Sequence, residues 1–340
     1  ISNSAWFRKG GAESDVIISS RVRLSRNLGN YAFPDSLSPS AEEELKKTII
    51  DAFINLPESH LFTILYMDEI DSMEKNVLLE RNLITDDFLS RKNGVFMVEE
   101  SGELSCMVGE KDHVRLSSIQ GGLSLKEAYE RLLEIDSILE NNVTYASSIE
   151  MGYLNPSLND VGTGLRASVL AHLPALELTG LLEETVELVV SKGFTVRAYH
   201  GKDKESTGNI YQIANKMGFG YDEGEIITHL VDLITPLISL ERKTREALYS
   251  RKTKEIEDKI GRAYGILTHC KMISLEEAVE LLSLIRLGVC LGFMGDISLE
   301  QVTRLFFLVQ KAHLQRILGK DNCRNDLCDA MRAEVLRDIL

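Results

Sequence analysis

The strongest constraint on the fold is a change of pattern about two thirds of the way along the chain. Up to about residue 225, glycines are frequent and short apolar runs alternate with polar turns. From about Glu225 onward glycine is sparse and apolar residues recur at helical spacing. We therefore expect an α/β (α+β) part over residues 1–245, with an antiparallel sheet flanked by helices, and a helical domain over residues 246–340.

Short patterns place the expected elements. Strands are predicted at Val95–Val98, Leu104–Val108, Val114–Ile119 and Thr195–Tyr199, and a short strand at 16–18 is predicted to run into a polar loop at 19–23. A helix is predicted over Glu183–Lys192, and loops over 152–166 and 201–205. Capping boxes, which mark helix starts, begin at Ser40, Ser124, Ser274 and Ser298.

The charge balance excludes one broad class of function. The 340 residues include 52 Asp and Glu against 38 Lys and Arg, a formal charge of −14. A general nucleic-acid binder needs a basic surface, so we expect no nucleic-acid partner. Net charge averages over the whole surface, however, and leaves room for a small basic pocket.

Cysteine and histidine usage argues against disulfides and metal sites. The five cysteines form no C-x-x-C pair, and the seven histidines form no H-x-x-x-H pair. No uncharged apolar run approaches the roughly 18 residues of a membrane span, and the first residues lack the features of a signal peptide. We expect a cytoplasmic protein with reduced thiols, no membrane association and no protein-bound metal.

Five arginines stand at the ends of predicted elements. An arginine carries a permanent charge and a planar fork that suits bidentate contacts to phosphate. Phosphoryl transfer depends mostly on positioning and charge neutralisation, so a group of arginines is a workable catalyst. Taken singly, each is better explained as an exposed arginine in a salt bridge. The five are Arg21, Arg23, Arg115, Arg166 and Arg197.

Taken together, the motifs around these arginines resemble those of the ATP:guanidino phosphotransferase (phosphagen kinase) family over nearly the whole chain. Ser-Ser-Arg-Val-Arg at 19–23 resembles the first nucleotide motif. Asp-His-Val-Arg at 112–115 resembles the end of N-E-E-D-H-x-R. Gly152-Tyr153, followed by Gly-Thr-Gly-Leu-Arg at 162–166, resembles the family signature.

Within that family the chain is most similar to the protein arginine kinase branch. Only 18 residues precede Ser19, where phosphagen kinases carry a separate helical domain, and a helical region follows residue 245. The resemblance implies ATP and Mg²⁺ as co-substrate and cofactor, and arginine side chains of proteins as acceptor. It also implies a homodimer, a stress-response role, an activator protein and components of a Clp protease as partners.

The resemblance also implies the site residues. ATP would be held by the five arginines and by segments next to them: Ser19, Ser20, Val22, Ala167, Ser168, Val169, Leu170, Ala198, Tyr199, His200, Gly201 and Lys202. The catalytic residues around the acceptor guanidinium would be Glu110, Asp112, Ser157 and Glu205. Phosphoarginine would bind Asp329 and Arg332 in the motif R-D-x-x-R-A, whose first arginine is Cys328 here.

The acceptor side departs from the family pattern. Lys111 replaces the second of two adjacent glutamates, Ser157 replaces a cysteine thiolate, and Lys202 replaces a loop glutamate. Asn82 stands where the family has a histidine. A carboxylate can orient a guanidinium and take up its proton, whereas a lysine repels it. Two readings remain open: a protein arginine kinase with an unusual acceptor site, and a pseudokinase that binds ATP and serves as a scaffold or adaptor.

Overall fold

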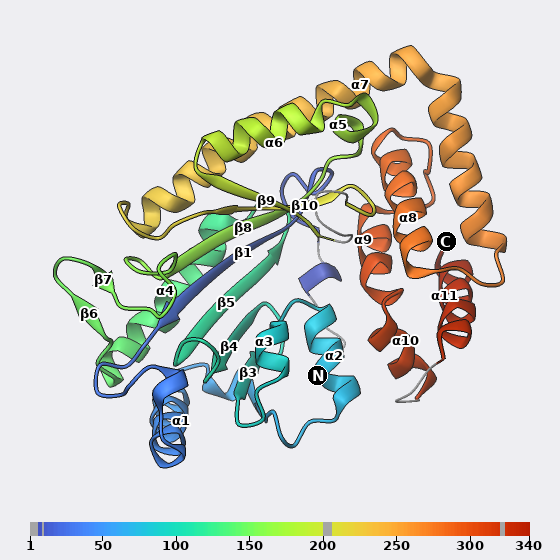
Figure 1. Cartoon of the computed structure of the whole chain (residues 1–340). Coiled ribbons are helices and arrows are strands. Elements are labelled where there is room, and N and C mark those ends of the chain that lie inside the picture. Colours follow the sequence, from blue (N-terminus) through green and yellow to red (C-terminus); the bar gives the residue numbers. More distant parts are fainter. Residues whose placement is uncertain (1–5, 9, 200–205, 320–323) are drawn as a thin grey trace.

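A computed structural model describes residues 6–8, 10–199, 206–319 and 324–340. Its centre is an eight-stranded sheet in the order β2-β3-β4-β5-β1-β8-β10-β9, with every neighbouring pair antiparallel (Figure 1). The expected antiparallel sheet with flanking helices is confirmed. The strands are β1 (Ile17–Arg26), β2 (Phe62–Tyr66), β3 (Val95–Glu99), β4 (Leu104–Val108), β5 (Val114–Gly121), β8 (Leu165–His172), β9 (Phe194–Ala198) and β10 (Ile210–Asn215). A separate hairpin pairs β6 (Ser147–Ser148) with β7 (Gly152–Tyr153).

The expected polar loop at 19–23 is wrong, because these residues lie inside β1. Central strand β1 pairs with β5 on one side and β8 on the other, so its backbone polar groups are satisfied without a turn. The strand alternates, with Val22 and Leu24 buried on one face and Arg21 and Arg23 on the other. The polar residues that suggested a loop are one face of this strand.

Helices cover both faces of the sheet (Figure 1). One face packs Val22, Leu24 and Leu116 against α1, α4 and the first half of α7. On the other face, Ile119, Leu170 and neighbouring apolar residues share a core with the C-terminal helices and η1. The helices are η1 (Trp6–Arg8), η2 (Pro34–Ser36), α1 (Pro39–Ile54), η3 (Ser59–Leu61), α2 (Ser72–Glu80), α3 (Asp86–Leu89), α4 (Leu125–Asn142), α5 (Pro174–Thr179), α6 (Leu182–Ser191), α7 (Glu223–His269), α8 (Leu275–Cys290), α9 (Leu299–Leu308), α10 (Lys311–Leu318) and α11 (Asn325–Ile339).

Of the four serines expected to begin capping boxes, two cap a helix with their side chains and two do not. Ser298 forms a complete box with Gln301, and the side chain of Ser274 caps α8. The box expected at Ser40 is wrong, because α1 is capped by Ser38, which places Pro39 at the first helical position. Ser124 stands at the start of α4, but its hydroxyl donates to the carbonyl of Gly121 instead of capping the helix.

The longest helix, α7, runs through the expected boundary near residue 245 and is non-helical only at Lys252. Its first half covers the sheet, and its second half contacts α8 and α11. The division into two domains at residue 245 stays a prediction. In the ranges that the structure describes, no helix combines the length and the apolar composition needed to cross a bilayer.

Candidate nucleotide and acceptor site

The five arginines singled out in the sequence lie on one face of the sheet. Residues directly across an antiparallel pair point to the same side. Arg23 of β1 lies across from Arg166 of β8. On the other side of β1, Ser25 lies across from Arg115 of β5. Strand alternation then places Arg21 beside Arg23 on the same face.

The fifth arginine joins this face through β10. Arg197 lies across from Gln212, and Gln212 lies across from Leu170 of β8, which shares the face of Arg166. We call these five residues the arginine face. The antiparallel register therefore gathers side chains that are as far apart in sequence as residues 21 and 197.

Four of the five guanidinium groups have no carboxylate partner in the described ranges. Among the ion pairs there, none involves Arg21, Arg23, Arg166 or Arg197. Arg21 donates its Nε to the Ser117 hydroxyl at 3.0 Å, and its Nη2 is buried without a hydrogen bond. In a chain with 14 surplus negative charges, this lack of carboxylates marks the arginine face as a place for an external anion.

Burial and mutual repulsion disfavour the charged form of these arginines. Burial, then the charge of Arg115, lowers the pKa of Arg21 to about 10. Burial, then the charges of Arg21, Arg115 and Arg166, lowers the pKa of Arg23 well below its usual value. Burial is also the main cause of a lowered pKa at Arg166. A polyphosphate bound here would relieve this repulsion.

Arg115 differs because it is paired with two carboxylates of the predicted acceptor side. It forms an ion pair with Glu110 and a second with Asp112, whose Oδ2 lies 2.9 Å from its Nη2. Both carboxylates are buried, and Glu110 also accepts from the Thr85 hydroxyl. Asn27 donates to the second oxygen of Asp112 at 3.0 Å. Arg115 therefore joins the arginine face to the acceptor carboxylates.

Lys111 points away from these carboxylates. Its Nζ lies 2.5 Å from Oδ2 of Asp87 on α3, and both side chains are 59% exposed. The hydrogen bond from Lys111 lowers the pKa of the Asp87 carboxyl. The repulsion expected between Lys111 and an acceptor guanidinium is therefore weakened by an exposed ion pair outside the acceptor side.

The loop that carries Ser157 is tied to Asp112. Asn27 donates to the carbonyl of Leu154 and to the Asn155 side chain, both at 3.1 Å, while it also holds Asp112. Ser157 is half-buried in this loop. The other predicted acceptor residue, Glu205, lies outside the described residues, as do His200, Gly201 and Lys202.

The predicted ATP-lining residues divide between the two faces. Ser19, Ser168 and Leu170 share the arginine face. The side chains of Ala198 and Tyr199 also alternate between faces, and the hydroxyl of Tyr199 accepts from Asn82. The remaining four project to the opposite face: Ser20, Val22, Ala167 and Val169. Their contact with ATP stays a prediction.

Sequence reasoning gave no role to Ser117 or Arg26. Ser117 holds Arg21, and its position two residues after Arg115 on the same strand would have placed it on the arginine face. Arg26 is buried on the opposite face, 2.7 Å from Asp136 and 3.0 Å from Glu223. Its partners lie on α4 and α7, so no local spacing could have identified them.

Near the C-terminus, Arg332 is engaged in structural contacts. Its Nη1 lies 2.6 Å from Oδ1 of Asp329 and 2.6 Å from the carbonyl of Ile273. Its Nε donates to the carbonyl of Val309 at 2.8 Å. Cys328, at the altered position of the motif, is buried. Binding of phosphoarginine by Asp329 and Arg332 stays a prediction.

The comparisons identify relatives over the whole chain. Residues 44–244 match the family model described as ATP:guanido phosphotransferase, C-terminal catalytic domain, and residues 253–340 match the protein-arginine kinase McsB C-terminal domain. A protein-arginine kinase of Halothermothrix orenii is 36% identical over 335 residues, covering 98% of this chain and 95% of the relative. One of Geobacillus stearothermophilus is 37% identical over 340 residues, covering 99% of this chain and 93% of the relative.

Solved structures share the fold. The duplicated taurocyamine kinase of Schistosoma mansoni, with bound transition state analog components, has a TM-score of 0.61 at 25% identity, covering 67% of this chain and 33% of that chain. A lombricine kinase has a TM-score of 0.60 at 21% identity, covering 71% of this chain and 72% of that chain. The second likeness concerns the fold alone.

Proposed function

Since this chain belongs to the ATP:guanido phosphotransferase family, we propose that it transfers a phosphoryl group from ATP to arginine side chains of proteins. The observation that carries the proposal is the arginine face, with four guanidinium groups that lack carboxylate partners in the described ranges. The curated relatives, which are named protein-arginine kinases and align over nearly the whole chain, support the choice of acceptor.

The five arginines would hold the phosphates of ATP and neutralise the charge that develops during transfer. Mg²⁺ would arrive on those phosphates, because in the described ranges no group of three or more metal-ligating side chains could hold an ion. The protein's own contribution is then to hold the polyphosphate and to bring the acceptor into line with it.

On the acceptor side, Glu110 would orient the incoming guanidinium and take up its proton. Its carboxylate is paired with Arg115 as long as Arg115 has no phosphate to bind. Bound phosphate would share Arg115 and loosen that pair, so ATP binding would prepare Glu110 for the acceptor. Asp112 would keep Arg115 in place through the ion pair between them, because Asn27 in turn donates a hydrogen bond to Asp112. Glu205 and Ser157 would complete the acceptor side.

The proposal extends to the cellular setting that the family implies. The protein would act in the cytoplasm as a homodimer in a stress response, with an activator protein and components of a Clp protease as partners. Phosphoarginine would bind near Asp329. These elements of the proposal rest on family membership. Arg332 already donates to two backbone carbonyls, so fewer of its N–H groups are left to bind a phosphoarginine.

The second candidate function is a pseudokinase that binds ATP and acts as a scaffold or adaptor. The observation in its favour is Ser157, whose hydroxyl stays neutral near pH 7 where the family has a thiolate. The arginine face would be retained in this case, and only the acceptor chemistry would be lost.

Labelled ATP and an arginine-rich protein separate the two functions. A kinase yields acid-labile, base-stable phosphate on the protein, and Arg166→Ala abolishes the signal. Arg324→Ala is the matched control, because Arg324 lies at the surface in an exposed pair with Asp326. ATP binding without transfer, together with transfer restored by Ser157→Cys, would establish the pseudokinase. If the unaltered protein does not bind ATP, both candidate functions are refuted.

A further inference from the structure

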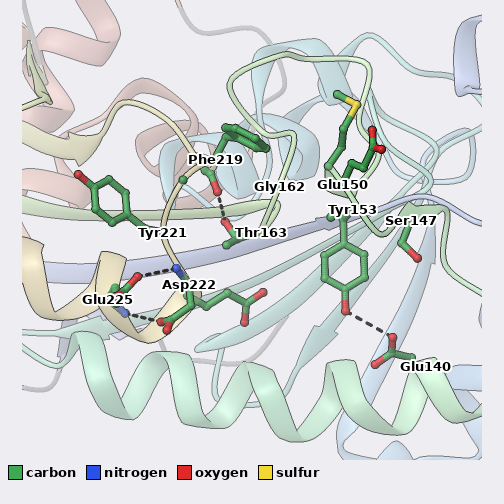
Figure 2. A pocket seen from close by; sticks show the side chains of 15 residues that line it. Glu140, Ser147, Glu150, Tyr153, Gly162, Thr163, Phe219, Tyr221, Asp222 and Glu225 are labelled. Carbon is green, nitrogen blue, oxygen red and sulfur yellow. Dashed lines mark hydrogen bonds between the residues drawn. The ribbon is translucent and has the colours of Figure 1, made fainter.

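The pocket beside the start of α7 does not reach the acceptor side. It is lined by the β6–β7 hairpin, the turn at 162–163 and the first turn of α7, and none of the predicted acceptor residues that the structure describes is among its lining residues (Figure 2). The Tyr153 hydroxyl on its wall donates to Glu140 of α4, at 3.4 Å. The groups that orient the proposed base, Glu110, are therefore found among the contacts of Glu110 itself.

Glu110 is held by the segment that contains α3. The hydroxyl of Thr85 donates to Oε1 of Glu110. Arg91, two residues after α3, donates from Nη2 to the backbone carbonyl of Glu110 at 3.0 Å. Asp87 on α3 pairs with Lys111, the residue that follows Glu110. This one segment thus fixes the side chain, the carbonyl and the neighbour of Glu110, whose own exposed fraction is 1%.

The single proton of the Thr85 hydroxyl is committed to Glu110. Thr85 is the N-cap residue of α3, and its oxygen accepts from the backbone N–H of Phe88 at 3.2 Å. Because a carboxylate has no proton to donate, Thr85 is the donor in the bond with Glu110. The helix cap therefore fixes the hydroxyl oxygen, and the hydroxyl in turn fixes Oε1.

The two carboxylate oxygens of Glu110 have different partners. Oε2 pairs with Arg115, whereas Oε1 accepts from Thr85. The proposed function gives Arg115 to a phosphate of ATP, which would leave Thr85 as the one side chain in the described ranges that still holds the carboxylate. A glutamate carboxylate turns easily about its last torsion. Without Thr85, the carboxylate of Glu110 would be free to turn away from the acceptor.

We propose that Thr85 is a positioning residue for phosphoryl transfer: its hydroxyl keeps Glu110 turned toward the acceptor guanidinium while Arg115 binds phosphate. This inference rests on the proposed function and deepens it, because it adds to the acceptor side a residue that the sequence motifs left without a role. Since Thr85 acts once ATP is bound, its loss should lower kcat and leave the KM for ATP nearly unchanged.

Three substitutions of Thr85 in the full chain separate this role from helix capping. Thr85→Val keeps the size of the side chain but removes both the cap and the donor. Thr85→Ser keeps both. Thr85→Asp keeps the cap, because aspartate is a good N-cap residue, but it has no proton for Glu110 and repels it.

The measurements are steady-state phosphorylation of a peptide that contains one arginine, and urea unfolding. Thr85→Val and Thr85→Asp should lower kcat by roughly ten- to a hundredfold, with the KM for ATP within about twofold of that of the unaltered protein. Thr85→Ser should keep most of kcat. Ser274→Ala is the matched control, because Ser274 caps α8 by accepting from the N–H of Glu277 at 3.1 Å; it should lower stability and leave kcat unchanged.

Two results overturn the inference in this assay. The first is a kcat in Thr85→Val equal to that of the unaltered protein. The second is recovery of kcat in Thr85→Asp, which restores the cap alone and would show that Thr85 acts only through the stability of α3.

A binding assay separates failure of this inference from failure of the proposed function. It follows the fluorescence anisotropy of the same peptide, labelled, and of its counterpart with citrulline, the neutral isostere, in place of arginine, with a non-hydrolysable ATP analogue present. The unaltered protein should prefer the arginine peptide, and Thr85→Val should lower this preference several-fold.

The two assays together decide every case. A preference that depends on Thr85, without any phosphoryl transfer, refutes the kinase and keeps the positioning role. Transfer that is unchanged in Thr85→Val refutes the positioning role alone. If the unaltered protein neither transfers phosphate nor prefers arginine, or if its preference is unchanged in Thr85→Val and no transfer occurs, both proposals are refuted.

Discussion

Two arginines of β1, Arg23 and Arg26, lie three residues apart and project to opposite faces of the sheet. Arg26 is enclosed by two carboxylates and the carbonyl of Thr163. Within the described ranges Arg23 forms no such ion pair or hydrogen bond; the charges of Arg21, Arg115 and Arg166 lower its pKa, and Asp160 opposes them only in part. The same residue type therefore contributes in opposite ways: Arg26 holds the sheet to α4 and α7, whereas Arg23 is held in an unfavourable state by the rest of the fold.

Substitution of Arg26 and substitution of Arg23 should have different effects on the free energy of unfolding. Arg26→Met leaves Asp136 buried and unpaired, so it should lower the free energy of unfolding by about 3–5 kcal/mol. Arg23→Met removes a repelled cation and should leave the nucleotide-free protein as stable or more stable by about 1 kcal/mol, while ATP binding is lost. Urea unfolding and nucleotide titration measure both. Destabilisation of similar size in the two variants would contradict an anion site at Arg23.

Lys111 provides a second prediction for a single residue. Because its ammonium group pairs with Asp87 at the surface, Lys111→Met should change stability by less than about 1 kcal/mol and leave the KM for ATP unchanged. Phosphorylation of an arginine substrate should change less than in Ser157→Ala, which alters the loop tied to Asp112. A large gain of activity in Lys111→Met would show that the ammonium group turns toward the acceptor in solution.

At the scale of elements, alternation explains which predictions from sequence succeed. The strands at 95–98 and 104–108 were correctly predicted, because their residues are apolar on both faces. The loop predicted over residues 19–23 is wrong, because one face of strand β1 carries polar residues of the kind that usually indicate a loop. The grouping of the arginines was predictable from family motifs. The lack of carboxylates around four of them was not, because it depends on which residues distant in sequence the fold brings next to each arginine.

The junction of α7 and α5 should respond to pH. Buried Glu241 of α7 accepts from the backbone N–H groups of Ala175 and Leu176 at the start of α5. Burial raises the pKa of its carboxyl to about 7, although Arg245 opposes the shift. The folded protein then binds this proton more tightly than the unfolded chain, so the stabilisation present below about pH 4.5 is lost as the pH rises through 7.

A variant isolates this contribution. Between pH 5 and pH 8, the unaltered protein should lose a few kcal/mol of unfolding free energy relative to Glu241→Gln, which has no proton to release. Urea unfolding of both proteins at the two pH values gives the difference. A difference that stays constant with pH would place the titration of Glu241 outside this range.

At the scale of the whole molecule, the arginine face and the C-terminal helices belong to one core. Ile119, Leu170 and Ile210 of the sheet pack in the same cluster as Leu282 and Phe307. Two buried hydrogen bonds of His172 reinforce the contact: Nε2 with Ser283 on α8 at 2.8 Å, and Nδ1 with Arg286 at 2.9 Å. Burial lowers the pKa of His172 well below its usual value, so it accepts from Arg286 as a neutral ring.

A chain that ends at residue 252 should therefore not fold into a stable nucleotide-binding unit. Removing α8 and α9 exposes Ile119, Leu170 and Ile210, the apolar residues on the sheet face that carries the arginines, and we expect aggregation or strong binding of a hydrophobic dye. The full chain should unfold in one cooperative transition by circular dichroism and tryptophan fluorescence. Two separate transitions, or a soluble truncated chain that binds ATP, would instead support two independent domains divided near residue 245.

If the proposed function holds, the arginines that lack carboxylate partners in the described ranges would also make the stability of the fold depend on the concentration of ATP. A ligand that binds only the folded chain adds to its unfolding free energy, by about 2.7 kcal/mol when its concentration is one hundred times the dissociation constant. ATP would thus neutralise the charge of the buried arginines in addition to donating a phosphoryl group. Without ATP the same guanidinium groups would repel one another without relief, and the folded chain would lose this contribution to its unfolding free energy.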